Sequence, residues 1–85
     1  MSDFPRHAPA LDITEVDDGL VVFEPVARKV HHLNVTATLV FELCTGDNDD
    51  AAIIEIVKTA FGMEAAPVAE VTQVLGSLRA EGLLV

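Results

Sequence analysis

The spacing of apolar residues changes at Leu33 and Asn34, and this switch constrains the fold more than any other feature of the sequence. Before it, short β-prone runs are separated by turn residues, which predicts strands. After it, apolar side chains recur at the i, i+3, i+4 and i+7 positions of amphipathic helices. We therefore expect an α+β fold in which a three-stranded antiparallel sheet is followed by three helices, similar to a winged helix-turn-helix.

Turn residues divide the first part of the chain into three predicted strands. Residues 11–16 and 20–23 flank Asp17-Asp18-Gly19, and Asp-Gly between β-prone runs is typical of a hairpin because both residues tolerate positive φ. Pro25 ends the second strand, since proline cannot donate to a ladder. Residues 28–33 form the third. A meander of this kind has two free edges, and each is a template for another extended chain.

Each predicted helix begins at a residue suited to that position. Asn34 and Asp49 carry side-chain oxygens that can accept hydrogen bonds from the first turn of a helix. Pro67 fits the first helical position. Glycines follow the expected ends of the helices, at Gly46, Gly62 and Gly82.

The first predicted helix is apolar on two sides. One stripe is Ala37, Val40, Phe41 and Cys44, and the other is Val35, Leu39 and Leu43. A helix that is apolar all round is either buried on every side or forms half of an interface. Both alternatives stay open at this point: the sheet and the other helices cover it, or it carries a homodimer.

Length and charge limit the classes of function. Eighty-five residues make one domain. Within it, residues 1–10 contain Pro5 and Pro9 without periodicity, which predicts a flexible arm before a folded domain of residues 11–85. Fourteen acidic residues against five basic ones give a net charge of -9, which disfavours nucleic acid and anionic membrane as partners. Without a signal peptide or a membrane span, we expect a cytoplasmic protein.

No constellation of residues predicts catalysis or a metal. His31 and His32 are neighbours on a strand, so their side chains point to opposite faces and cannot easily share one ion. Cys44 lies at the end of an apolar helix before an acidic loop, which predicts a core residue. We therefore expect no enzyme, no cofactor and no metal. A DNA-binding winged-helix regulator is the alternative, although Arg79 is the only basic residue of the third helix.

Four segments together resemble the PqqD family, which is named after a small protein of pyrroloquinoline quinone biosynthesis. They are Asp18-Gly19, residues 30–37 (VHHLNVTA), residues 43–46 (LCTG) and residues 78–84 (LRAEGLL). The resemblance extends over residues 11–85. It implies a non-enzymatic recognition domain that binds the leader segment of a ribosomally made precursor peptide. The domain then presents that peptide to a modifying enzyme, such as a radical S-adenosylmethionine enzyme, in the biosynthesis of a natural product.

The resemblance also implies a place for the peptide, which adds as a strand to the third strand beside the third helix. The residues carried over are Arg28, Lys29, Val30, His31, His32 and Leu33 from the strand, and Val71, Val74, Leu75, Leu78 and Arg79 from the helix. Three of the five basic residues fall in this set, at Arg28, Lys29 and Arg79. We therefore expect a local positive patch that selects an acidic residue of the leader.

Overall fold

The computed structural model describes residues 4–85 and has the predicted order of elements. One antiparallel sheet has the strand order β1-β2-β3 and is followed by three helices. The bounds are β1 (Asp12–Val16), β2 (Gly19–Glu24), β3 (Lys29–Leu33), α1 (Val35–Glu42), α2 (Asp50–Ala60) and α3 (Val68–Ala80). The predicted α+β class is confirmed.

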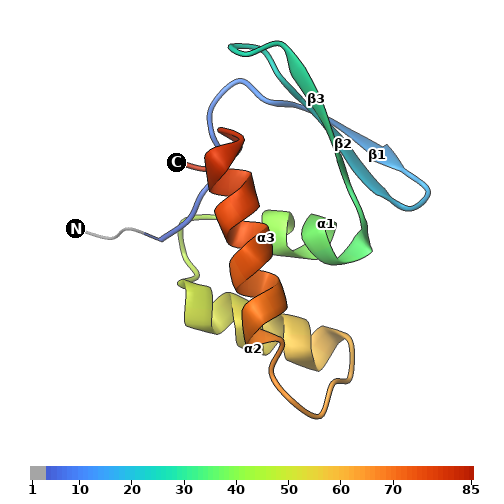
Figure 1. Cartoon of the computed structure of the whole chain (residues 1–85), viewed down its shortest axis with the longest axis vertical. Helices are drawn as coiled ribbons and strands as arrows, with labels where there is room; N and C mark the ends of the chain where they lie inside the picture. Colours follow the sequence, from blue (N-terminus) through green and yellow to red (C-terminus); the bar gives the residue numbers. More distant parts are fainter. Residues whose placement is uncertain (1–3) are drawn as a thin grey trace.

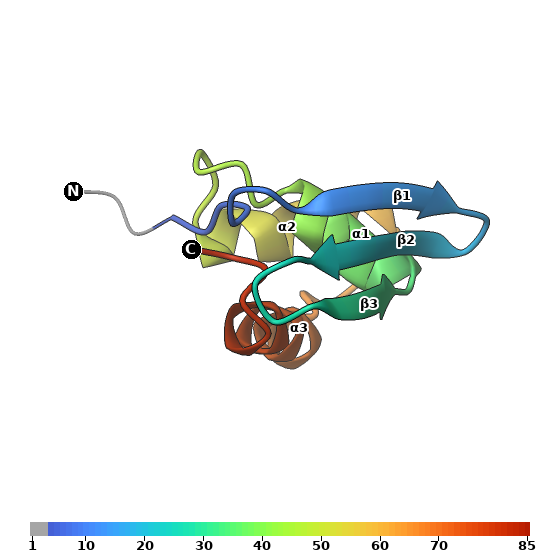
Figure 2. The same ribbon diagram turned by 90° about the horizontal axis from the view of Figure 1, so that it is seen from above.

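The sheet stands at one end of the molecule and the helices form the other. Figure 1 shows α1 between the sheet and α2, with α3 running across both other helices. Seen from above in Figure 2, the three strands form one layer, with α3 on the β3 side and β1 on the far side. This arrangement leaves β3, and not β1, as the edge strand next to a helix.

The predicted capping residues begin α1 and α2. Asn34 Oδ1 accepts the N–H of Ala37 at 2.9 Å, and Asp49 Oδ1 accepts the N–H of Ala52 at 2.8 Å. Pro67 differs slightly from the prediction, because it precedes α3 as the capping residue and makes no side-chain hydrogen bond there. Two of the three helix starts therefore rest on local hydrogen bonds that the sequence encodes directly.

The core joins the inner face of the sheet to all three helices. Its buried members are Leu20, Val22, Leu33, Val40, Phe41, Cys44, Ile53, Val57, Val71, Leu75, Leu78, Leu83 and Leu84. Both stripes of α1 contribute to it. Val40 and Phe41 are buried, while Leu39 and Leu43 are partly buried and pack against the core. The buried alternative for α1 is therefore largely confirmed, and a homodimer through this helix stays a prediction.

The turn between β2 and β3 corrects the predicted start of the third strand. Arg28 lies in this turn with φ +57°, and β3 begins at Lys29. The buried Glu24 carboxylate accepts the N–H groups of Val26 and Ala27, at 2.6 and 2.9 Å. These bonds close the loop tightly, so the chain must reverse before Lys29, and Arg28 adopts the left-handed conformation that the reversal needs.

The N-terminal segment corrects a second prediction, because residues 5–8 are docked and not a free arm. Pro5 is buried, and its carbonyl oxygen accepts the N–H of Gly46 at 3.0 Å. Arg6 and Ala8 exchange backbone hydrogen bonds with the C-terminal residues 83–85. These partners are distant in sequence, so no local sequence pattern predicts the pairing. The first three residues of the predicted arm lie outside the described residues.

His7 completes this docking and provides a test of it. Its ring stacks on Phe41 with centroids 3.9 Å apart, and its Nε2–H donates to the carbonyl oxygen of Phe41. We expect His7→Ala to lower the free energy of unfolding by about 1.5–2 kcal/mol, because a stacked pair and a hydrogen bond are lost. Urea denaturation measures this. Arg6→Ala, at an exposed neighbour, should change stability by less than about 0.5 kcal/mol; equal losses would contradict the docking.

Gly76 lies inside α3 with open space around it. Alanine there should raise the free energy of unfolding by about 0.5–1 kcal/mol, because glycine loses more backbone entropy in a helix. The same change at Gly82, which has φ +78° just after α3, should destabilise the protein. Thermal melts of the two variants should therefore shift in opposite directions, and a lower melting temperature for Gly76→Ala would contradict this account.

Candidate functional site

The free edge of β3 presents unpaired backbone groups at alternate residues. Val16 and Gly19 flank the two-residue turn between β1 and β2, so they exchange both of their backbone hydrogen bonds. Successive residues of β2 then face β1 and β3 in alternation. Through the pairing of Val22 with His31, this alternation directs the N–H and C=O groups of Val30 and His32 away from β2. β3 therefore offers two outward residues to another extended chain.

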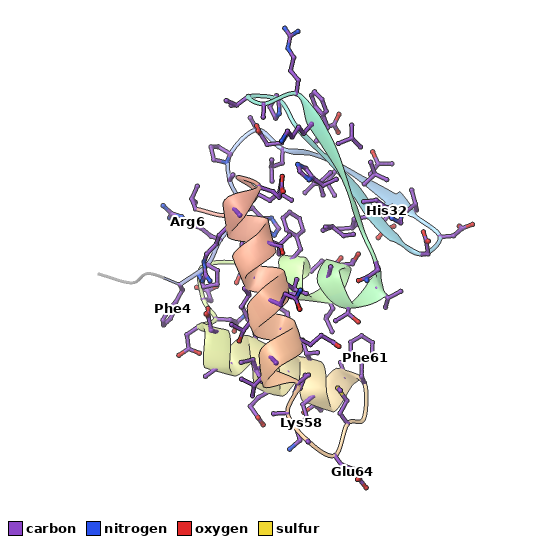
Figure 3. The ribbon with its side chains drawn as sticks, in the orientation of Figure 1. Phe4, Arg6, His32, Lys58, Phe61 and Glu64 are labelled. Atoms are coloured by element: carbon purple, nitrogen blue, oxygen red, sulfur yellow. The ribbon has the colours of Figure 1, made fainter. Side chains whose placement is uncertain are left out.

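The side chains of β3 alternate between the two faces of the sheet. Leu33 and His31 lie on the inner face, opposite the buried Leu20 and Val22, and Leu33 is itself buried. His32 lies on the outer face, exposed, with its Nε2 3.3 Å from Asp18 Oδ1 (Figure 3). Of the two histidines, only His31 would therefore face an added chain on the inner side of the sheet, where the helices lie.

The α3 residues expected to contact a peptide divide into two groups. Val71, Leu75 and Leu78 are almost fully buried in the core, so the structure leaves them no surface for a peptide. Val74 is partly buried at the margin of that core. Val74 is thus the one predicted apolar residue of α3 that keeps a partly exposed surface.

One residue of the site was missing from the prediction. Glu81, just after α3, brings its Oε2 to 3.9 Å from His31 Nδ1 and so links the helix to β3. It follows Val74 by seven residues, which is two helical turns and hence the same flank of the helix. That spacing was visible in the sequence, but only the contact with His31 shows which flank of α3 faces the sheet.

The predicted positive patch is not formed. Arg79 points to the start of α2, where its Nη2 lies 3.2 Å from Asp50 Oδ1. Its distance in sequence from Val74 and Glu81 explains this, since a helix turns about 100° per residue and places Arg79 on the other side of the core stripe. Arg79 therefore does not join Arg28 and Lys29, which are consecutive residues at the turn and the start of β3.

The described part of the chain holds no arrangement typical of catalysis. Burial raises the pKa of the Cys44 thiol to about 11, and its Sγ donates to the carbonyl oxygen of Val40. A thiol with that pKa stays protonated near neutral pH and is a poor nucleophile. Among residues 4–85, no group of three His, Cys, Asp or Glu side chains could hold a metal ion.

Comparison with known proteins identifies the family. The profile described as coenzyme PQQ synthesis protein D (PqqD) matches residues 19–84, from the start of β2 to the end of the core. The chain belongs to the PqqD family. The matched range includes β3, α3 and Glu81, so every element of the candidate site lies within the PqqD homology.

A solved structure has the same fold as this PqqD-family chain. It is a lasso peptide synthetase B1 complexed with the leader peptide, and it aligns with a TM-score of 0.79 over 96% of this chain and 98% of that one. The sequences are 18% identical, so the likeness is one of fold. No curated protein matches the sequence. No helix within residues 4–85 has the length and apolar character needed to cross a membrane.

Proposed function

We propose that this PqqD-family protein is a non-catalytic recognition domain for the leader segment of a ribosomally made precursor peptide. The leader adds as a fourth strand at the free edge of β3, beside α3. Backbone hydrogen bonds to Val30 and His32 supply affinity that depends little on sequence, and neighbouring side chains select the leader. The bound precursor is then presented to a modifying enzyme, such as a radical S-adenosylmethionine enzyme, in the cytoplasm.

The observation that carries this proposal is the free β3 edge with a helix alongside it. β1 has a free edge too, but all of its residues are exposed, and α3 lies on the β3 side of the sheet (Figure 2). The His31–Glu81 pair stands at the β3 edge, so an added chain gains side-chain contacts as well as backbone bonds. The lasso peptide synthetase B1 of the same fold, which holds a leader peptide, supports this function.

The side chains on the exposed face of α3 do not favour the DNA-binding alternative. A recognition helix needs free basic or amide side chains on its exposed face. Arg79 is held by Asp50, and the exposed face of α3 also carries Glu70, which leaves Gln73 as the one exposed amide side chain of this helix. The net negative charge of the protein, -9, repels a phosphate backbone.

A displayed library of random 12-residue peptides tests the proposal. We expect selection on the immobilised protein to recover binders, and amide hydrogen exchange with one of them to show new protection at Val30 and His32. Ile13 and Glu15, whose N–H groups face the free edge of β1, serve as the control and should stay unprotected. Failure to recover any binder, or protection confined to β1, would contradict strand addition at β3. Tight binding of duplex DNA at physiological salt would favour the regulator instead.

A further inference from the structure

An acidic residue, Glu81, lies next to β3 just after the C-terminal end of α3. The contact with His31 identifies Glu81 as part of the flank of α3 next to β3, and helical spacing places Glu70 and Val74 on the same side of the helix. Arg79, the basic residue of α3, is engaged with Asp50 on the opposite side of the core stripe. The basic residues of the β3 region are Arg28, in the turn, and Lys29, at the start of β3 and opposite Glu24 in the register.

The contact between His31 and Glu81 leaves both partners incompletely satisfied. At 3.9 Å, the separation of His31 Nδ1 and Glu81 Oε2 is too long for a hydrogen bond. His31 Nε2 is buried and has no hydrogen-bond partner in the described part of the chain. The Glu81 side chain is 48% exposed, so water now solvates its carboxylate.

A chain added at β3 would change the surroundings of that carboxylate. Neighbouring strands lie about 4.8 Å apart, and cross-strand side chains on one face come within about 5 Å of each other. The residue of the added strand opposite His31 therefore points to the α3 side and lies beside Glu81. Its backbone displaces water from Glu81, and a carboxylate that loses water needs a new donor.

We infer that Glu81 selects a Lys or Arg side chain on the leader, at the position that pairs with His31 of β3. This inference rests on the proposed function and names the chemistry of its ligand. His31 is too far from the Glu81 carboxylate to donate a hydrogen bond to it, and a basic side chain of the leader supplies that donor. An Arg side chain can bind the carboxylate through two parallel hydrogen bonds. The sequence predicts that the protein selects an acidic leader residue, whereas the structure favours a basic one, because Arg79 is turned to α2. The net charge of -9 adds a favourable long-range field for such a leader.

The experiment repeats the random 12-residue library selection on the wild-type protein, on Glu81→Gln and on Glu81→Lys. We expect the wild type to enrich Lys or Arg at one position of its aligned binders. Glu81→Gln should lose that enrichment, and Glu81→Lys should replace it with Asp or Glu. Glu64→Gln is the matched control, because it removes the same charge from a loop at the far end of the molecule (Figure 3) and should keep the wild-type preference.

Titration of one selected peptide measures the size of the effect. Glu81→Gln, or replacement of the peptide's Lys by norleucine, should each weaken binding about fivefold. The two changes together should weaken binding no further than either alone, since both remove one interaction. Thermal melts check that the Gln variant stays folded.

Two kinds of failure are distinguishable. Binders that show no basic preference in the wild type, or an equal preference in Glu81→Gln, would overturn this inference and leave strand addition at β3 standing. If no binder were recovered from any variant, the proposed function itself would fall.

Discussion

Gly19→Ala is expected to lower the free energy of unfolding by about 3 kcal/mol or more, and to leave the protein largely unfolded if its stability is at the low end for small domains. Gly19 has φ +152°, and a Cβ atom built on it would lie 1.7 Å from the carbonyl oxygen of Leu33. That oxygen also accepts from Thr38 Oγ1 at 3.2 Å. The alanine methyl group would therefore push apart β2, β3 and the first turn of α1 where all three meet. Urea denaturation followed by circular dichroism measures the loss.

Gly62 provides the matched control for this substitution. It also has positive φ, at +61°, but a Cβ atom there would meet nothing within 4 Å. Gly62→Ala should therefore cost only the conformational penalty of about 1–2 kcal/mol. If Gly19→Ala cost no more than Gly62→Ala, close approach of the backbones at Leu33 would not be the reason for this glycine.

His32→Pro is expected to weaken peptide binding at least tenfold, which is a loss of about 1.4 kcal/mol or more. Proline removes the outward N–H of His32, and its ring meets the incoming strand. The ladder to β2 keeps its bonds because His32 faces away from β2. Fluorescence anisotropy with a library-selected peptide measures the affinity, and a thermal melt should show a folded protein.

Two further proline variants separate edge pairing from general damage. Glu15→Pro removes an outward N–H from the other free edge, on β1, and should bind the peptide as the wild type does. His31→Pro removes a donor to β2 and should lower the melting temperature. Normal binding by folded His32→Pro, or lost binding in Glu15→Pro, would contradict strand addition at β3.

The order of the elements could be predicted because its signals are local. The change of apolar spacing at Leu33 and the caps at Asn34 and Asp49 each involve residues within four positions of one another, and the structure has them in the expected places. The same holds for the strand residues of the site. Once the turn at Asp17 and Asp18 is known, alternation assigns Val30 and His32 to the free edge.

The helix side of the site was predicted less well, because an apolar stripe does not tell how much of it the core covers. Val71, Leu75 and Leu78 form such a stripe, and in this small domain all three side chains are buried in the core. Glu81 borders the site only because α3 is rotated to place it there. That rotation is decided by packing against α1 and α2, which no pattern within α3 encodes.

What the sequence determined by itself was the fold class, the caps and the alternation of the β3 edge. Tertiary structure alone decided three things: the docking of residues 5–8, the direction of Arg79 and the contact of Glu81 with His31. Each of these joins segments that are 29 or more residues apart along the chain, as Arg79 and Asp50 are. Local propensity acts over about one helical turn, whereas such pairs form only when the burial of a shared core brings distant segments together.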